Sequence, residues 1–205
     1  MSKTIQDSYN TVARGHRQVV IDTETTGLVD AHLVSIGLLE IVDGKPTGKS
    51  LYSVVNPGVI MDQKVIDIHH ITNEMAKECP PFSTVAKQVR DFIGDSQVVI
   101  TCRTVNNYTL DIGVLNMEMQ KAKQPQIPAQ QWLNVRRWSE EMYGNDGAKL
   151  DAVLDRFGVS RAYRVSQGHG SMLDAELLAE VYPKLAAAYK EFKKNAPASK
   201  IQPKP

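Results

Sequence analysis

Four acidic residues and one histidine, widely separated along the chain, are of the types needed for metal-assisted phosphodiester hydrolysis. Asp22 and Glu24 lie in Ile-Asp-Thr-Glu-Thr-Thr-Gly, Asp111 lies in Leu-Asp-Ile-Gly-Val-Leu, and His169 and Asp174 lie in His-Gly-Ser-Met-Leu-Asp. Carboxylate oxygens are hard ligands that suit Mg²⁺ or Mn²⁺. Two such ions can activate a water and stabilise the leaving oxygen of an in-line phosphoryl displacement. An imidazole, with an ordinary pKa of about 6.5, can take the proton of that water near neutral pH.

Each of these residues also has an ordinary structural explanation. An Asp-x-Glu triplet at a strand end is commonly just solvated. Asp111 stands at the front of a predicted helix, where a carboxylate stabilises the N-terminus by roughly 0.3–1 kcal/mol. His169 lies between two glycines, which is less common, but a loop histidine is usually a surface residue. The chemical interpretation therefore requires that all five side chains converge in space.

Strand periodicity offers one way to bring two of the carboxylates together. Residues 18–22 form a short apolar run with β-branched side chains, which predicts a buried strand. Side chains at i and i+2 share a face of a strand, so Asp22 and Glu24 are expected to point into one cleft. Residues 33–42 and 50–55 predict two further strands, the first followed by Asp43-Gly44, a hairpin signal. We expect these three strands to form an antiparallel meander.

Helices and strands alternate in the remainder of the chain, which predicts an α/β fold with a mixed sheet and helices on its faces. Ser83 is the expected N-cap of the first helix, Gly158 is a stop signal, and Pro183 is expected to kink or restart the last helix. The predicted helices are 83–93, 110–121, 137–143, 148–157 and 173–192, and the predicted strands are 97–101 and 131–135. We expect a polar lead-in over residues 1–16, one domain over 17–192, and a mobile Lys/Pro-rich tail over 193–205.

Composition bounds the possible classes of function. The formal net charge is only +1, which excludes a polybasic nucleic-acid coat protein but not an acidic active site offset by basic residues elsewhere. Two cysteines are too few for a disulfide framework and lack zinc-ligand spacing. Residues 1–16 contain no apolar signal core, and no run approaches the length of a membrane span. A cytoplasmic protein without a membrane partner is expected.

Taken together, the motifs resemble those of the DEDDh (DnaQ-like) 3′-to-5′ exonucleases, and most closely those of the proofreading (epsilon) subunits of bacterial DNA polymerase III. Residues 18–27 resemble the first exonuclease motif, residues 111–115 the second, and residues 169–182 the third. Residues 69–71 and 150–152 resemble segments that precede the second and third motifs. Three motifs in the family's order are far more specific than any one of them.

The resemblance implies a ribonuclease-H-like, five-stranded mixed sheet with helices on both faces. It implies hydrolysis of single-stranded nucleic acid from the 3′ end to nucleoside 5′-monophosphates, with DNA favoured over RNA. Two Mg²⁺ or Mn²⁺ ions would be held by four carboxylates, and His169 would be the general base. The implied metal ligands are Asp22, Glu24, Asp111 and Asp174, and the implied substrate contacts are Thr25, Thr26, Gly27, Leu28 and Asn107.

The chain departs from the family pattern in and around the second motif. Asn106 stands where a histidine is common, about five extra residues (101–105) precede it, and Asn134 stands where an aspartate is expected. The short tail does not support a polymerase partner. Three alternatives stay open: a nucleic-acid- or partner-binding module with little or no turnover, an RNA-specific exonuclease, and an endonuclease. Four arginines, at positions 136, 137, 161 and 164, are either phosphate contacts or ordinary solvated side chains.

Overall fold

The apolar run of residues 18–21 forms the central strand of a five-stranded sheet, where it is buried on both faces. The computed structural model describes residues 16–105 and 108–195. The strand order is β3-β2-β1-β4-β7. The strands are β1 (Arg17–Thr25), β2 (Leu33–Val42), β3 (Lys45–Val54), β4 (Gln97–Ile100) and β7 (Trp132–Asn134). β1, β2 and β3 pair antiparallel, whereas β4 and β7 run parallel to β1, so the predicted mixed sheet is confirmed.

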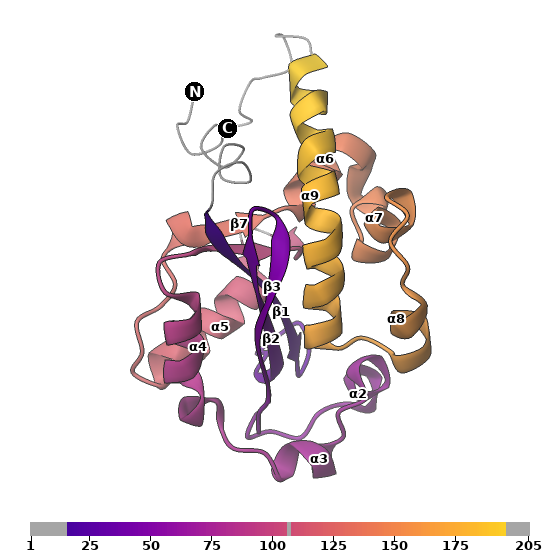
Figure 1. Cartoon of the computed structure of the whole chain (residues 1–205). Helices are drawn as coiled ribbons and strands as arrows, with labels where there is room; N and C mark the ends of the chain where they lie inside the picture. The colour runs from indigo at the N-terminus through magenta and orange to yellow at the C-terminus, as the bar shows by residue number, and fades with distance from the viewer. Residues whose placement is uncertain (1–15, 106–107, 196–205) are drawn as a thin grey trace.

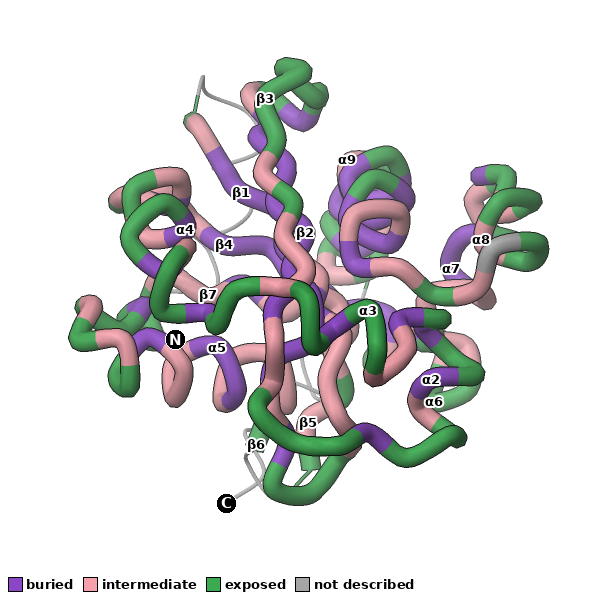
Figure 2. The backbone as a smooth tube through the Cα atoms, turned by 90° about the horizontal axis from the view of Figure 1, so that it is seen from below, coloured by how far each residue is buried: buried purple, intermediate pink, exposed green. Residues whose placement is uncertain are grey.

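The hairpin between β2 and β3 follows the turn signal in the sequence. Asp43 and Gly44 have φ angles of 53° and 71°, which is the mirror-image turn that matches the twist of paired strands. Pairing therefore resumes at once, with Val42 opposite Lys45. β3 begins at Lys45, five residues before the predicted start, because the tight turn extends the ladder through polar residues at an exposed edge (Figure 2).

Helices cover both faces of the sheet (Figure 1). Alternation along β1 separates the two layers, with Val19 and Ile21 in one core and Val20 in the other. The first core is covered by α4 (Ala86–Ile93) and α5 (Leu110–Lys121). The second is covered by α6 (Arg136–Gly147), α7 (Leu150–Arg156) and α9 (Ser171–Asn195). Buried residues therefore follow the sheet and the inward side of α9 in Figure 2.

Two expected helix signals act differently in the structure. Ser83 does not cap α4; it lies inside a short 3₁₀ helix (Phe82–Thr84), and α4 begins at Ala86. The buried Phe82 ring and the fixed φ of Pro81 hold this turn ahead of the helix. Pro183 does not restart α9, which continues through it as one helix. Its lost backbone hydrogen bond is offset by Tyr182 and Leu185, which are fully buried in the core.

Several short elements have no counterpart in the sequence prediction. They are α2 (Gln63–His69), α3 (Asn73–Lys77), the 3₁₀ turn Ala129–Gln131, α8 (Ala162–Gln167) and a small hairpin of β5 (Thr104–Val105) and β6 (Tyr108–Thr109). The hairpin accounts for part of the extra segment at 101–105. Helix α9 extends to Asn195, so the first residues of the expected tail are helical. The rest of that tail and nearly all of the lead-in lie outside the described residues.

No helix in the described part of the chain is both long and apolar enough to cross a lipid bilayer.

Candidate active site

Asp22 and Glu24 extend from the end of β1 toward α9. They belong to the same strand face as Gln18, whose Nε2 donates to the hydroxyl of Tyr182 on α9 at 2.9 Å. Thr23, between them, faces the opposite layer. The expectation that Asp22 and Glu24 share a face is therefore confirmed, and their shared face is the one that α9 covers.

The first turn of α9 meets the sheet directly beside Asp22. Gly37 of β2 pairs with Asp22 across the antiparallel ladder. A Cβ atom on Gly37 would lie 2.5 Å from the carbonyl oxygen of Ser171, so only glycine permits this contact. The hydroxyls of Ser35 and Ser171, both fully buried, lie 2.9 Å apart and fasten the same turn. This close approach places Asp174, one turn along α9, against the end of β1.

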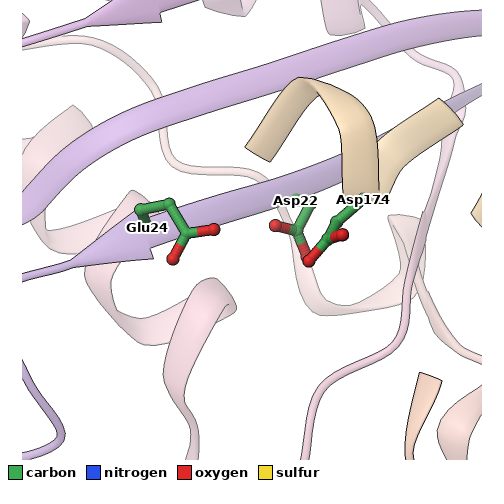
Figure 3. A group of neighbouring side chains, drawn as sticks. All are labelled: Asp22, Glu24 and Asp174. Atoms are coloured by element: carbon green, nitrogen blue, oxygen red, sulfur yellow. The ribbon is translucent and has the colours of Figure 1, made fainter. Parts of the chain in front are cut away.

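Asp22, Glu24 and Asp174 form one carboxylate cluster (Figure 3). One oxygen from each lies within 4.8 Å of the other two. Loss of hydration, and then the charges of Glu24, Asp111 and Asp174, raise the pKa of Asp22 well above its usual value. Loss of hydration, followed by the charges of Asp174 and Asp111, raises the pKa of Glu24 to about 8. An all-oxygen donor set under such mutual repulsion fits Mg²⁺ or Mn²⁺, whose charge would relieve it.

His169 stands beside this cluster at the entrance to the site. Its Nδ1 lies 3.6 Å from an oxygen of Asp174, and its side chain is 45% exposed. The backbone N–H of His169 donates to the carbonyl of Ile68 at the end of α2, at 3.0 Å. Gly168 has a φ of 78°, and a Cβ there would overlap the ring of His70, so glycine is required. Burial, and then the charge of Arg164, lower the pKa of His169.

Arg164 of α8 is a member of the site that the sequence assigned only to phosphate contact or solvent. Its Nε and Nη2 donate to the two carboxylate oxygens of Asp174 at 2.6 and 3.0 Å. It also pairs with Asp151 of α7. Burial opposes the charge of Arg164, but the hydrogen bond to Asp174 and the charges of Asp174 and Asp151 outweigh it and raise its pKa. Sequence alone gave no signal for this contact, because it depends on where α8 docks.

Asp111 lies at the site but outside the cluster of three. Its carboxylate accepts a hydrogen bond of 2.6 Å from the hydroxyl of Thr23, on the other face of β1. Burial raises the pKa of Asp111, while hydrogen bonds from Cys102 and Thr23 lower it. Because its charge acts on both Asp22 and Glu24, it is part of the same electrostatic site.

Four of the expected substrate contacts lie at the last residue of β1 and in the turn that follows it. Thr25 donates from Oγ1 to the carbonyl of Gly27 at 2.8 Å, and Thr26 accepts from the N–H of His32 at 3.0 Å. Gly27 has a φ of 152°. Leu28 is 81% exposed, so an apolar side chain faces solvent just beyond the carboxylates. Asn107, the remaining expected contact, lies outside the described residues, as does Asn106.

A pocket of about 220 Å³ opens beside the carboxylate cluster. The carboxylate cluster, Arg164 and His169 line it, and Arg136 and Lys149 add positive charge. The arrangement places metal-ligand oxygens, an imidazole and cationic side chains around one opening. Such a set is suited to binding a phosphodiester and hydrolysing it with metal assistance.

Comparison with known proteins agrees with this chemistry. The exonuclease family model (RNase_T) matches residues 19–182. The DNA polymerase III subunit epsilon of Haemophilus influenzae is 31% identical over 185 residues, which cover 82% of this chain and 66% of that protein. The Rickettsia prowazekii subunit epsilon is 36% identical over 172 residues, covering 81% and 72%. The chain thus spans just under two thirds of the Haemophilus protein.

The fold has a close structural counterpart as well. The nuclease domain of 3′hExo, a DEDDh family member bound to rAMP, matches with a TM-score of 0.66 at 16% identity, over 89% of this chain and 94% of that one. At this identity the likeness concerns the fold, which is of the ribonuclease-H-like type. The expected exonuclease family and the expected fold are both confirmed. By its family model and its relatives, the chain belongs to the DEDDh exonuclease family.

Proposed function

We propose that the protein is a 3′-to-5′ exonuclease that hydrolyses single-stranded ends, DNA in preference to RNA, to nucleoside 5′-monophosphates. The observation that supports this most directly is the convergence of Asp22, Glu24 and Asp174, with oxygens within 4.8 Å of one another. Carboxylates that repel one another in a pocket are costly to maintain, and cation binding is the simplest function that explains them.

Two divalent ions, Mg²⁺ or Mn²⁺, are the cofactors proposed for this site. Asp22, Glu24 and Asp174 would hold them, together with Asp111, whose charge already acts on two of these residues. When bound, such ions activate the attacking water and stabilise charge on the leaving oxygen. Zinc is less suited, because it prefers more nitrogen and sulfur ligands than this cluster offers.

The protein's own residues supply proton transfer and positioning. His169 is half-exposed at the pocket and is proposed as the general base. Lys149, whose side chain is 67% exposed, lines the same pocket and is placed to attract the phosphate backbone, whereas Arg136 in the pocket wall is paired with Glu140 at 2.8 Å. The turn from Thr25 to Leu28 is proposed to hold the terminal nucleotide, with the exposed Leu28 side chain against its base.

The preference for DNA is supported by the curated relatives, which are named as subunits of a DNA polymerase. A structural relative was solved with rAMP, so a ribonucleotide is a reasonable competitor. Discrimination between the two depends on how a site treats the 2′-hydroxyl.

A side-by-side digestion tests the proposal. Single-stranded DNA and RNA oligomers of one sequence, labelled at the 5′ end, are incubated with the protein and Mn²⁺. We expect a ladder that shortens from the 3′ end, faster on DNA, and no products with chelator. Faster loss of RNA would reverse the substrate preference. Cleavage of circular single-stranded DNA would identify an endonuclease, and no products from any substrate would favour a binding module.

A further inference from the structure

Arg164 makes a set of contacts that the proposed reaction does not require. The Nε and Nη2 atoms donate to both oxygens of Asp174, at 2.6 and 3.0 Å. Nη2 also lies 2.8 Å from Nδ1 of His169, and Nη1 donates to an oxygen of Asp151. Only 9% of the arginine side chain is exposed. One buried cation therefore contacts a proposed metal ligand, the proposed base and a second, peripheral carboxylate.

The contact with Asp174 places Arg164 in competition with a divalent ion. Two parallel hydrogen bonds to a carboxylate are the strongest arrangement that a guanidinium forms. The same oxygens are the ones that a metal ion would use, and a fixed positive charge beside them repels that ion. Full occupancy of the metal centre is therefore unfavourable while Arg164 keeps both contacts.

The contact with His169 determines which nitrogen of the imidazole ring carries the proton. Every guanidinium nitrogen is a donor and none is an acceptor. Nδ1 of His169 must therefore accept from Arg164, so the single proton of the neutral ring lies on Nε2. In this state neither ring nitrogen has a free lone pair for a proton from water. The same side chain thus withholds both a metal ligand and the base.

Asp151 gives Arg164 a partner away from the carboxylate cluster. It lies on α7, its side chain is 41% exposed, and Nη1 of Arg161 lies 3.5 Å from it. An arginine that releases Asp174 would keep this ion pair instead of remaining buried without one. The cost of leaving a buried charge unpaired, which is otherwise large, is thereby reduced.

We propose that Arg164 is a built-in competitor for the metal centre. It holds Asp174 and His169 while no divalent ion is bound, and it retreats to Asp151 when an ion binds, which frees the base at the same moment. The inference rests on the proposed function, because it assumes that Asp22, Glu24 and Asp174 hold the ion. Arg164 is thus a positioning residue that makes the base available only in the metal-bound site.

Mn²⁺ titration calorimetry of the full chain is the first test. We expect Arg164→Gln to bind Mn²⁺ about tenfold more tightly than wild type, within the usual range of coupling between sites. Arg156→Gln is the matched control, because Arg156 lies at the end of α7 but its guanidinium stacks on the Tyr143 ring, 4.0 Å from the ring centre. Its affinity should stay within about twofold of wild type. Unchanged or weaker binding by Arg164→Gln overturns the inference.

Asp151→Asn should have the opposite effect. Without its peripheral partner, Arg164 stays on Asp174, so Mn²⁺ affinity should fall by about threefold or more. If the Arg164–Asp151 ion pair were only structural, Arg164→Gln and Asp151→Asn would both weaken Mn²⁺ binding, because both would loosen the site. Effects in the same direction therefore overturn the proposal.

The ring nitrogens of His169 give a readout that needs no substrate. In ¹⁵N-histidine-labelled protein without metal, we expect the tautomer protonated at Nε2, and a change when diamagnetic Mg²⁺ is added. Arg164→Lys keeps the charge but cannot bridge Asp174 and His169 with a planar fork, so its tautomer should respond little to Mg²⁺. A wild-type tautomer that ignores Mg²⁺ contradicts the inference. Wild-type protein that binds neither ion would instead overturn the proposed function itself.

Discussion

At the scale of single residues, the carboxylate cluster destabilises the folded protein and is also the proposed metal site. Burial and like charge raise the pKa of both Asp22 and Glu24, so the metal-free site resists ionisation. The thiol of Cys102 is affected by the same charges: burial, and then the charge of Asp111, raise its pKa. Residues that work against folding in this way are usually retained for chemistry.

Asp22→Asn should separate these two effects. The amide keeps the shape of the side chain but removes a charge from a crowded site, so we expect the metal-free protein to gain about 1 kcal/mol in its free energy of unfolding. Turnover should fall by roughly three orders of magnitude, because a proposed metal ligand is lost. Chemical denaturation with chelator and exonuclease assays with Mn²⁺ measure the two quantities. Full activity in this variant would place the chemistry elsewhere.

His169→Ala should lower turnover by about 10²- to 10⁴-fold, the usual contribution of a general base. Mn²⁺ affinity should change little, because the imidazole is not among the cluster's ligand groups. Steady-state kinetics and calorimetry on one preparation give both values. His16→Ala, at an exposed position, is the control for histidine removal as such. A parallel loss of metal affinity would make His169 a ligand instead of a base.

Residue types in the sequence indicated most of the residues that the structure brings together in the candidate site, and hydrogen bonding explains one departure from the family pattern. Asn134 accepts from the backbone N–H of Cys102 and donates to its carbonyl at 2.6 Å, joining the ends of β7 and β4. An ionised aspartate could not make the second bond. Arg164 was not predictable, since a charged residue in sequence looks the same whether it meets solvent, phosphate or a carboxylate.

At the scale of elements, the most demanding contact is that of α9 on β2. Helix periodicity predicted α9, but nothing in the sequence indicated that its first turn lies on the backbone of Gly37. Helix ends were predicted best from the sequence where a glycine adopts a positive φ angle. The helix predicted over 137–143 breaks at Gly144, whose φ is 72°, and α7 ends shortly before Gly158. Short elements such as α2 and α8 have too few turns for a recognisable period.

Gly37→Ala should disturb the site from a distance. Its methyl group would lie 2.5 Å from the Ser171 carbonyl and 2.6 Å from the Cα of Met172, so the start of α9 must move and take Asp174 with it. We expect a loss of about 1–3 kcal/mol in stability, typical of overpacking, and a clear loss of turnover. Ser35→Ala is the comparison: it removes the contact with the Ser171 hydroxyl without adding an atom. It should lower stability by about 1 kcal/mol and largely spare turnover, as urea denaturation and kinetics would show.

At the scale of the whole molecule, the sheet and one helical layer are joined by ion pairing at the end opposite the site. Arg17 of β1 bonds Glu40 of β2 and also donates to the Phe92 and Ile93 carbonyls at the end of α4. Thr47 and Lys49 of β3 contact the same carboxylate, at 2.9 and 3.3 Å. The two-residue period of the strands predicted the sheet, but it gave no reason to expect a buried glutamate in an apolar strand.

Glu40 should make the fold sensitive to acid. The hydrogen bond from Arg17, assisted by Thr47 and Lys49, lowers its pKa from 4.5 to about 2. A carboxyl whose pKa is lower in the folded state stabilises the protein above the unfolded value, and this contribution is lost as pH falls from about 4.5 to 2. Because Arg17 is 36% exposed, we discount the effect to about 2 kcal/mol.

Urea denaturation of wild type and Glu40→Gln at several pH values isolates this contribution, since other titrating groups are common to both. The variant should be about 2 kcal/mol less stable at pH 7, and the difference should shrink steadily below pH 4.5. Glu191→Gln is the matched control. Its pKa is also lowered, by hydrogen bonds from Asn195 and Lys194, but it is exposed on the last turns of α9 and should leave stability unchanged. A difference that persists at pH 2 would mean that the Glu40 side chain acts through packing, and that its charge does not join the sheet to the helical layer.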